Sequence, residues 1–119
     1  MAAVLLTNDL VFSSKVAGGA MRQGIRVETA LSVAALLEKV QAADVRLVML
    51  DLTAAGLDPR VLVPQLRAAA SSACKVLAFG PHVHEAKLET ARAAGCELVL
   101  SRGQFNAQLD QILLDHAAG

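Results

Sequence analysis

The stretch Arg46-Leu47-Val48-Met49-Leu50-Asp51 decides the fold. Its four central residues are all apolar, and charged side chains bound the run at both ends. A run this short is typical of a strand, and its continuous apolar character indicates that both of its faces are covered. Strands of this kind belong to parallel sheets, so the stretch predicts an inner strand over 46–50 with Asp51 at its carboxyl end.

Similar strand-like segments occur along the rest of the chain, at 3–7, 25–29, 75–79 and 97–100. Helical patterns separate and follow them, at about 11–22, after Ser32, from Asp58-Pro59 to about Ala70, over about 84–94, and around Phe105, Leu109, Ile112 and Leu113. Ser32 and Asp58 are residue types that cap helix starts, and proline suits the first helical position. The alternation predicts an α/β fold: a flavodoxin-like, doubly wound, five-stranded parallel sheet of order 2-1-3-4-5 with five helices in a three-layer αβα sandwich.

Composition narrows the function classes. The 119 residues are 55% hydrophobic and 18% charged, with a mean hydropathy of +0.48, which fits one domain over 1–119. Eleven basic residues balance eleven acidic ones, so neither nucleic acid nor an anionic membrane is an expected partner. No apolar run approaches the ~20 residues of a membrane span, and the N-terminus lacks a basic flank. We therefore expect a cytoplasmic protein, with Cys74 and Cys96 as small buried hydrophobic residues.

Acidic residues mark the candidate site. Asn8-Asp9 follows the first predicted strand and Asp51 ends the third, and these two strands are neighbours in the predicted order. Ligands of open parallel sheets bind at the carboxyl strand ends, where the chain reverses its winding. Paired carboxylates there could hold Mg²⁺ with additional waters. Each aspartate taken alone also fits a helix cap or a turn residue.

Three segments carry a resemblance to a known family. The segments 4–9 (Val-Leu-Leu-Thr-Asn-Asp), 47–52 (Leu-Val-Met-Leu-Asp-Leu) and 93–96 (Ala-Ala-Gly-Cys) resemble, in order and spacing, the receiver domain of bacterial response regulators. The resemblance implies that Asp51 is the phosphoacceptor for a histidine kinase. It also implies that Asp9, Asp51 and the carbonyl group of Thr53 would hold Mg²⁺.

The sequence departs from the family pattern at four positions of the phosphorylation site. Asn8 stands where a second acid is usual, and Gly80 stands where a Ser or Thr hydroxyl is usual. Arg102 replaces the family's lysine, and Val99 replaces the aromatic residue that moves on phosphorylation. A neutral Asn8 predicts weak Mg²⁺ binding, and the planar guanidinium of Arg102 does not act like an ammonium group. The moving hydroxyl and the moving aromatic ring are both missing.

These departures favour an atypical receiver, or pseudoreceiver, which is not an enzyme and which signals through protein–protein contacts. One alternative is a receiver still phosphorylated on Asp51 in a two-component phosphorelay. Another is a flavodoxin-like domain for a small ligand, although neither GxGxxG nor GxxxxGK[ST] occurs. A Ser or Thr side chain within bonding reach of the acidic cleft would contradict the pseudoreceiver hypothesis.

Two further predictions concern protein partners and a pair of histidines. Histidine kinases and output domains are the partners that the resemblance implies, with a homodimer through the fourth helix, fifth strand and fifth helix. That face would use Glu85, Lys87, Glu89, Arg92, Glu97, Gln104, Gln108 and Asp110. His82 and His84 could present two imidazoles to a metal, but we favour a polar loop, with His84 in the first turn of its helix.

Overall fold

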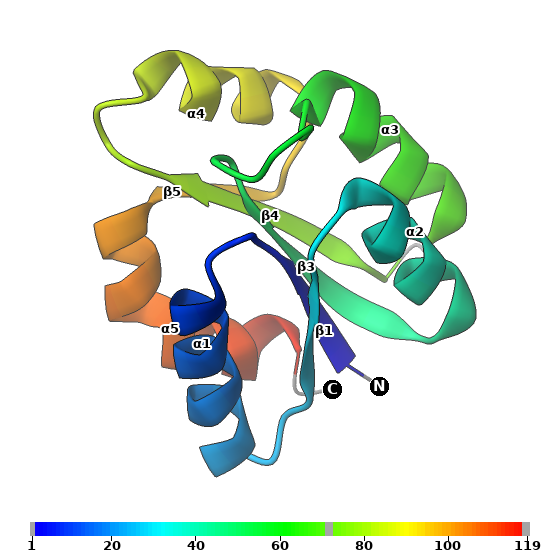
Figure 1. The fold of residues 1–119 in the computed structure, drawn as a ribbon, viewed down its shortest axis with the longest axis vertical. Helices are drawn as coiled ribbons and strands as arrows, with labels where there is room; N and C mark the ends of the chain where they lie inside the picture. Colours follow the sequence, from blue (N-terminus) through cyan, green and yellow to red (C-terminus); the bar gives the residue numbers. More distant parts are fainter. Residues whose placement is uncertain (1, 71–72, 118–119) are drawn as a thin grey trace.

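The computed structural model describes residues 2–70 and 73–117, in which five strands alternate with five helices. The strands are β1 (Ala2–Leu6), β2 (Val27–Ala30), β3 (Val45–Asp51), β4 (Lys75–Gly80) and β5 (Leu98–Ser101). The helices are α1 (Leu10–Arg22), α2 (Val33–Ala42), α3 (Pro59–Ala69), α4 (Glu85–Ala93) and α5 (Arg102–His116). All strand pairs are parallel, and their order β2-β1-β3-β4-β5 confirms the predicted doubly wound fold (Figure 1).

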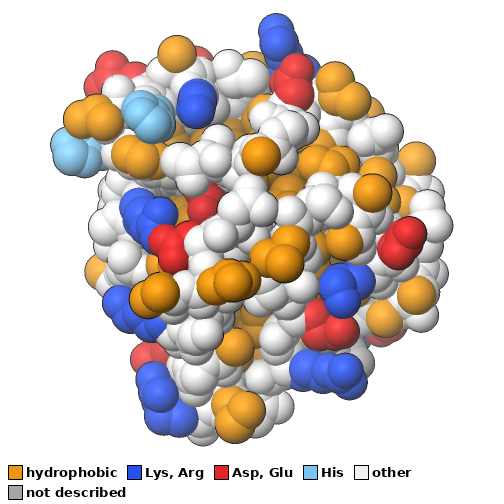
Figure 2. All heavy atoms as spheres, viewed as in Figure 1, with side chains coloured by type: hydrophobic (Ala, Val, Ile, Leu, Met, Phe, Trp, Pro, Cys, Tyr) orange, Lys and Arg blue, Asp and Glu red, His pale blue; other side chains and the backbone are white. Residues whose placement is uncertain are grey.

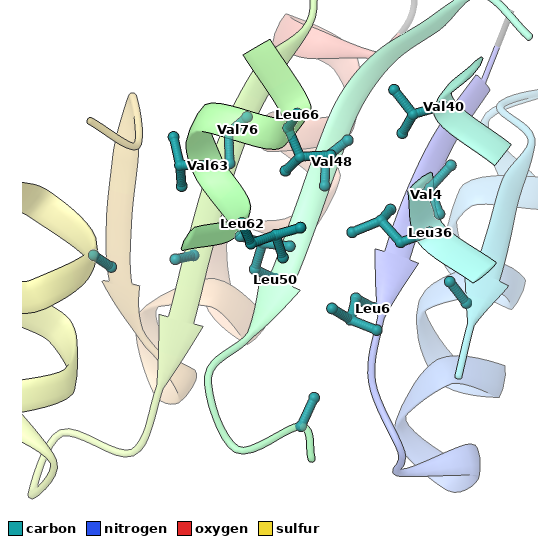
Figure 3. Close-up of a cluster of buried hydrophobic side chains, with 14 of the residues drawn as sticks. Val4, Leu6, Leu36, Val40, Val48, Leu50, Leu62, Val63, Leu66 and Val76 are labelled. Carbon is teal, nitrogen blue, oxygen red and sulfur yellow. The ribbon is translucent and has the colours of Figure 1, made fainter. Parts of the chain in front are cut away.

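Two hydrophobic cores lie on opposite faces of the sheet. Val48 and Leu50 of β3 belong to the core under α2, α3 and α4, which Figure 3 shows in close-up. Leu47 and Met49 of the same strand belong to the core under α1 and α5. Successive side chains of a strand point to opposite faces, so a continuous apolar strand supplies both cores at once. This arrangement explains why the stretch 46–51 has no polar alternation.

The helix ends follow from side chains named in the sequence. Ser32 Oγ accepts a hydrogen bond from the Ala35 amide at 3.1 Å, and Asp58 Oδ1 accepts one from the Arg60 amide at 3.1 Å. Pro59 is the first residue of α3, where its missing amide proton costs nothing. After α4, Gly95 adopts φ +99°, a conformation that favours glycine and that turns the chain toward β5.

Several strand boundaries differ by one or two residues from expectation, as does the burial of one cysteine; the first strand, predicted to end at Thr7, ends at Leu6. The strand predicted over 25–29 begins at Val27, because the Ile25 amide still donates to the Ala20 carbonyl at the end of α1. The strand predicted over 97–100 begins at Leu98. Cys74 is buried, as predicted, whereas Cys96 is only half-buried.

Within residues 2–70 and 73–117, no helix combines the length and the apolar character needed to cross a bilayer. On the face shown in Figure 2, acidic and basic side chains are interspersed, and hydrophobic side chains gather across the middle of the face.

Candidate functional site at the carboxyl edge of the sheet

The candidate site lies where β1 and β3 end side by side. Their register pairs Leu6 with Leu50, so the residues that follow each strand emerge at the same edge of the sheet. The chain leaves β1 into α1 on one face, and leaves β3 toward α3 on the other face (Figure 1). This is the point at which the winding reverses, and it brings Asp9 and Asp51 to one edge of the sheet, as predicted.

Asp51 is a buried carboxylate held by three donors. Its side chain is 1% exposed, and the Thr7 hydroxyl donates to Oδ2 at 2.7 Å. Thr53 donates twice to Oδ1, from its amide at 2.9 Å and from its hydroxyl at 2.6 Å. Hydrogen bonds to a charged acceptor are the strong ones, so these donors fix the carboxylate and offset the cost of burying it.

Thr7 is the site residue that the sequence reasoning missed. It is fully buried, and its hydroxyl also accepts a hydrogen bond from the Asp9 amide at 3.1 Å. One hydroxyl therefore connects Asp51 to the loop that carries Asp9. The only signal in the sequence was a hydroxyl-bearing residue at the end of the apolar run 3–6.

The two threonines also correct an expectation. A Ser or Thr side chain near the acidic cleft was expected to be absent, yet the hydroxyls of Thr7 and Thr53 both bind Asp51. That expectation was wrong, because it considered only the hydroxyl position on the fourth strand. The two hydroxyls count against the pseudoreceiver hypothesis as it was stated from the sequence, and the hypothesis now depends on Gly80 at the end of β4. Both hydroxyls come from the loops that follow β1 and β3.

Asp9 is the N-cap of α1 and the partner of Arg102. Its Oδ1 accepts from the Phe12 amide at 2.9 Å, and its Oδ2 accepts from Arg102 Nη2 at 3.0 Å. The amide hydrogen bond and the guanidinium together lower the pKa of Asp9 below its usual value. The Arg102 guanidinium also lies 4.3 Å from the centre of the Phe12 ring. Arg102 thus lies beside the predicted metal ligand, and its structural contacts are to Asp9 and Phe12.

Asn8 uses its amide group to join loops. Its nitrogen donates to the Leu31 carbonyl at 2.8 Å, and its oxygen accepts from the Ala55 amide at 2.8 Å. The side chain therefore bridges the loop after β2 and the loop after β3. An amide can donate and accept in this way, whereas a carboxylate at this position could only accept.

Gly80 and Val99 lie on the two strands at the far side of the site. Gly80 ends β4, pairs with Ser101, and is buried. A Cβ built on Gly80 would lie 3.4 Å from the Cβ of Leu52, so that side chain fills the space beside the glycine. Val99 pairs with Ala78 and packs, half-buried, against the core under α4.

The oxygens that a magnesium ion would use are already engaged within the protein. Each oxygen of Asp9 and Asp51 already accepts a hydrogen bond from the protein, and a cation already contacts Asp9. In the part of the chain that the structure describes, no three His, Cys, Asp or Glu residues come together as a metal site.

His84 is the N-cap of α4 and makes no capping bond through its side chain, which corrects its predicted place in the first turn.

The site and fold define a doubly wound α/β domain with an acidic pair, Asp9 and Asp51, at its switch point. No family model matches the sequence, and no curated protein matches it. Solved structures do match the fold over nearly the whole chain. One is a response-regulator receiver domain from Bermanella marisrubri, with TM-score 0.82, 21% identity, and coverage of 96% of this chain and 95% of that one.

Two further matches agree. The NtrX receiver domain from Brucella abortus has TM-score 0.80 and 18% identity, and 95% of each chain is covered. The receiver domain of a sensor histidine kinase from Pseudomonas aeruginosa has TM-score 0.81 and 16% identity, with 99% of this chain and 98% of that one covered. That structure has a magnesium ion coordinated in its active-site cleft. This chain therefore has the fold of receiver domains.

Proposed function

We propose that this protein is an atypical receiver domain, a pseudoreceiver, that works in bacterial signal transduction through protein–protein contacts. The observation that carries the proposal is Gly80. A receiver that responds to phosphorylation needs a side chain at the end of β4 that can hydrogen-bond the phosphoryl group. Gly80 has none, and the Leu52 side chain lies against it. The half-buried Val99 supports the same proposal, because an aliphatic side chain provides no ring to move into the space beside β4.

The charges of the cleft also favour this function. Phosphoryl transfer depends on positioned cations that stabilise the equatorial oxygens. Here the guanidinium of Arg102 contacts Asp9, while the oxygens of Asp51 accept hydrogen bonds from Thr7 and Thr53. Any Mg²⁺ that binds Asp9, Asp51 and the Thr53 carbonyl must share these oxygens, so we expect its binding to be weak. In this proposal the domain is not an enzyme and acts in the cytoplasm.

A phosphoacceptor receiver is the second candidate function. Two hydroxyls beside Asp51, from Thr7 and Thr53, favour it because each could donate to an oxygen of a phosphoryl group. In that case a histidine kinase would phosphorylate Asp51 and the degenerate positions would alter only the response. The two candidates differ in whether a change at Asp51 reaches β4 and β5.

Amide chemical shifts distinguish these candidates. The labelled protein is titrated with beryllofluoride and Mg²⁺, and the shifts are mapped on the chain. The pseudoreceiver predicts no shifts beyond the neighbours of Asp51. Shifts that spread through α4 and β5 would overturn it and favour the phosphoacceptor. Asp51→Asn is the control for specific binding, and Gly80→Ser, whose Cβ fits at ordinary contact distance, should extend the shifts into β4.

The proposal for partners names the surface of the domain to which they bind. We expect contacts with a kinase or an output domain, and homodimer formation, through α4, β5 and α5. Five residues predicted on that face are already engaged within the chain: Glu97 binds Arg67, Asp110 accepts from Gln23 at the end of α1, Glu89 pairs with Arg92, and Gln104 accepts from the Ser101 amide. The candidate face therefore narrows to exposed side chains of α4 and of the first half of α5, such as Lys87 and Gln108.

A further inference from the structure

Arg102 is held by two contacts beside the acidic pair Asp9 and Asp51. Its Nη2 atom lies 3.0 Å from Asp9 Oδ2, and its guanidinium lies 4.3 Å from the centre of the Phe12 ring. Phe12 packs in turn against Phe79 and Phe105, with ring centroids 5.4 and 5.8 Å away. The sequence contains no Tyr or Trp, and these three Phe rings form one buried support under the guanidinium.

The contact with Arg102 places a positive charge beside Asp9. Among residues 2–70 and 73–117, Arg102 is the only cationic side chain within 4.0 Å of Asp9, and none lies that close to Asp51. The Arg102 and Asp9 side chains are 32% and 43% exposed, so the ion pair alone is screened by solvent. The ring beneath the guanidinium adds a cation–π attraction. The two contacts together favour one position of the side chain.

We propose that Arg102 is the resident cation of this cleft and competes with divalent metal ions for Asp9. The proposal rests on the receiver-type function proposed above, because it concerns the same acidic cleft. A divalent ion can bind Asp9 fully only if the guanidinium leaves Oδ2. Arginine suits this role because it stays charged, is weakly hydrated, and has a planar group that can lie on a ring while it pairs with a carboxylate.

The test measures metal binding without any phosphoryl analogue. Mn²⁺ is titrated into the labelled protein, and the paramagnetic broadening of the Asp9 and Thr53 amide signals gives the dissociation constant. Arg102→Gln should bind Mn²⁺ at least tenfold more tightly than the wild type. Arg26→Gln is the matched control, because exposed Arg26 pairs with Glu28 at the start of β2, at the opposite end of the sheet from Asp9, and should leave the constant unchanged.

Further variants test whether the tighter binding depends on Asp9 and on the planar group of Arg102. Asp9→Asn should abolish the tighter binding in the Arg102→Gln background. Arg102→Lys keeps the charge but loses the planar group, and it should give a smaller gain than Arg102→Gln. The proposal is wrong if Arg102→Gln, folded by circular dichroism, binds Mn²⁺ no more tightly than the wild type. Because beryllofluoride is absent, that failure would not affect the proposed function, whose own test is the spread of shifts from Asp51.

Discussion

At the scale of single residues, the Thr7 hydroxyl joins the two strand ends of the site. It donates to Asp51 Oδ2 and accepts from the Asp9 amide, and its side chain is fully buried. A buried carboxylate that loses a donor retains the desolvation cost without the compensating hydrogen bond. The contribution of Thr7 should therefore be visible in the free energy of unfolding.

We expect Thr7→Val to lower the free energy of unfolding by about 1.5–3 kcal/mol, the range for a hydrogen bond to a charged group. Valine keeps the shape of threonine, so the loss reports the hydroxyl and not a cavity. Urea unfolding followed by circular dichroism measures it. Thr90→Val is the matched control, because the Thr90 hydroxyl only donates to the Ala86 carbonyl of its own helix. Equal stability of the two variants would show that the Thr7 hydrogen bonds contribute little.

Single residues also show which features of the structure the sequence could predict and which it could not. Asp58-Pro59 predicted a helix start because both residues act on their own backbone. The partners of Thr7 and Arg102 depend instead on segments far along the chain: Thr7 binds Asp51, and Arg102 binds Asp9. Position in a family pattern placed Arg102 at the cleft, but only the packing of Phe12 and the start of α5 determine which carboxylate it contacts.

At the scale of elements, Glu97 connects three elements at the amino ends of β4 and β5, away from the candidate site. Its carboxylate accepts from the Val76 amide at 2.7 Å and pairs with Arg67 of α3 at 2.6 Å. Glu97 was predicted to lie on a partner face because the resemblance to receiver domains implied pairing through the fourth helix, fifth strand and fifth helix. The structure uses it to connect β4, the start of β5 and α3, a role that no periodicity in the sequence could indicate.

The pKa of Glu97 gives a pH-dependent prediction for these elements. Burial alone would raise this pKa, but the hydrogen bonds from Arg67 and the Val76 amide outweigh burial and leave it below the usual 4.5. A lowered pKa means that the stabilising contribution is complete above pH 4.5 and is lost as the pH falls through the folded-state value. Wild type should therefore exceed Glu97→Gln in stability at pH 7, and the difference should shrink below pH 4.5.

Urea unfolding of both proteins at several pH values between 7 and 3.5 measures that difference. Glu89→Gln serves as the control, because the Glu89–Arg92 pair lies on the exposed surface, where ion pairs contribute about 0–1 kcal/mol. A difference between wild type and Glu97→Gln that stays constant with pH would contradict the assigned role of the Glu97 carboxylate.

At the scale of the whole molecule, one sheet supports two cores. Leu62 of α3 lies in the core on one face, and Leu113 of α5 lies in the core on the other. The strands between them contribute alternate side chains to both cores, so neither core can be lost while the sheet remains intact. The domain should therefore unfold as a single cooperative unit.

Native-state hydrogen exchange tests this cooperation between the two faces. Leu62→Ala should lower the free energy of unfolding by about 2–5 kcal/mol, as expected for a leucine removed from a packed core. If the two faces unfold together, Leu62→Ala should also speed hydrogen exchange of the slowest α5 amides by the same free energy. Leu62 itself packs on the opposite face of the sheet from α5. Leu113→Ala should have the reciprocal effect on the slowest amides of α3. Val61→Ala is the matched control, because Val61 is adjacent to Leu62 but 58% exposed, and should change neither set. Unchanged α5 exchange in Leu62→Ala would mean that the two layers of helices open independently of each other.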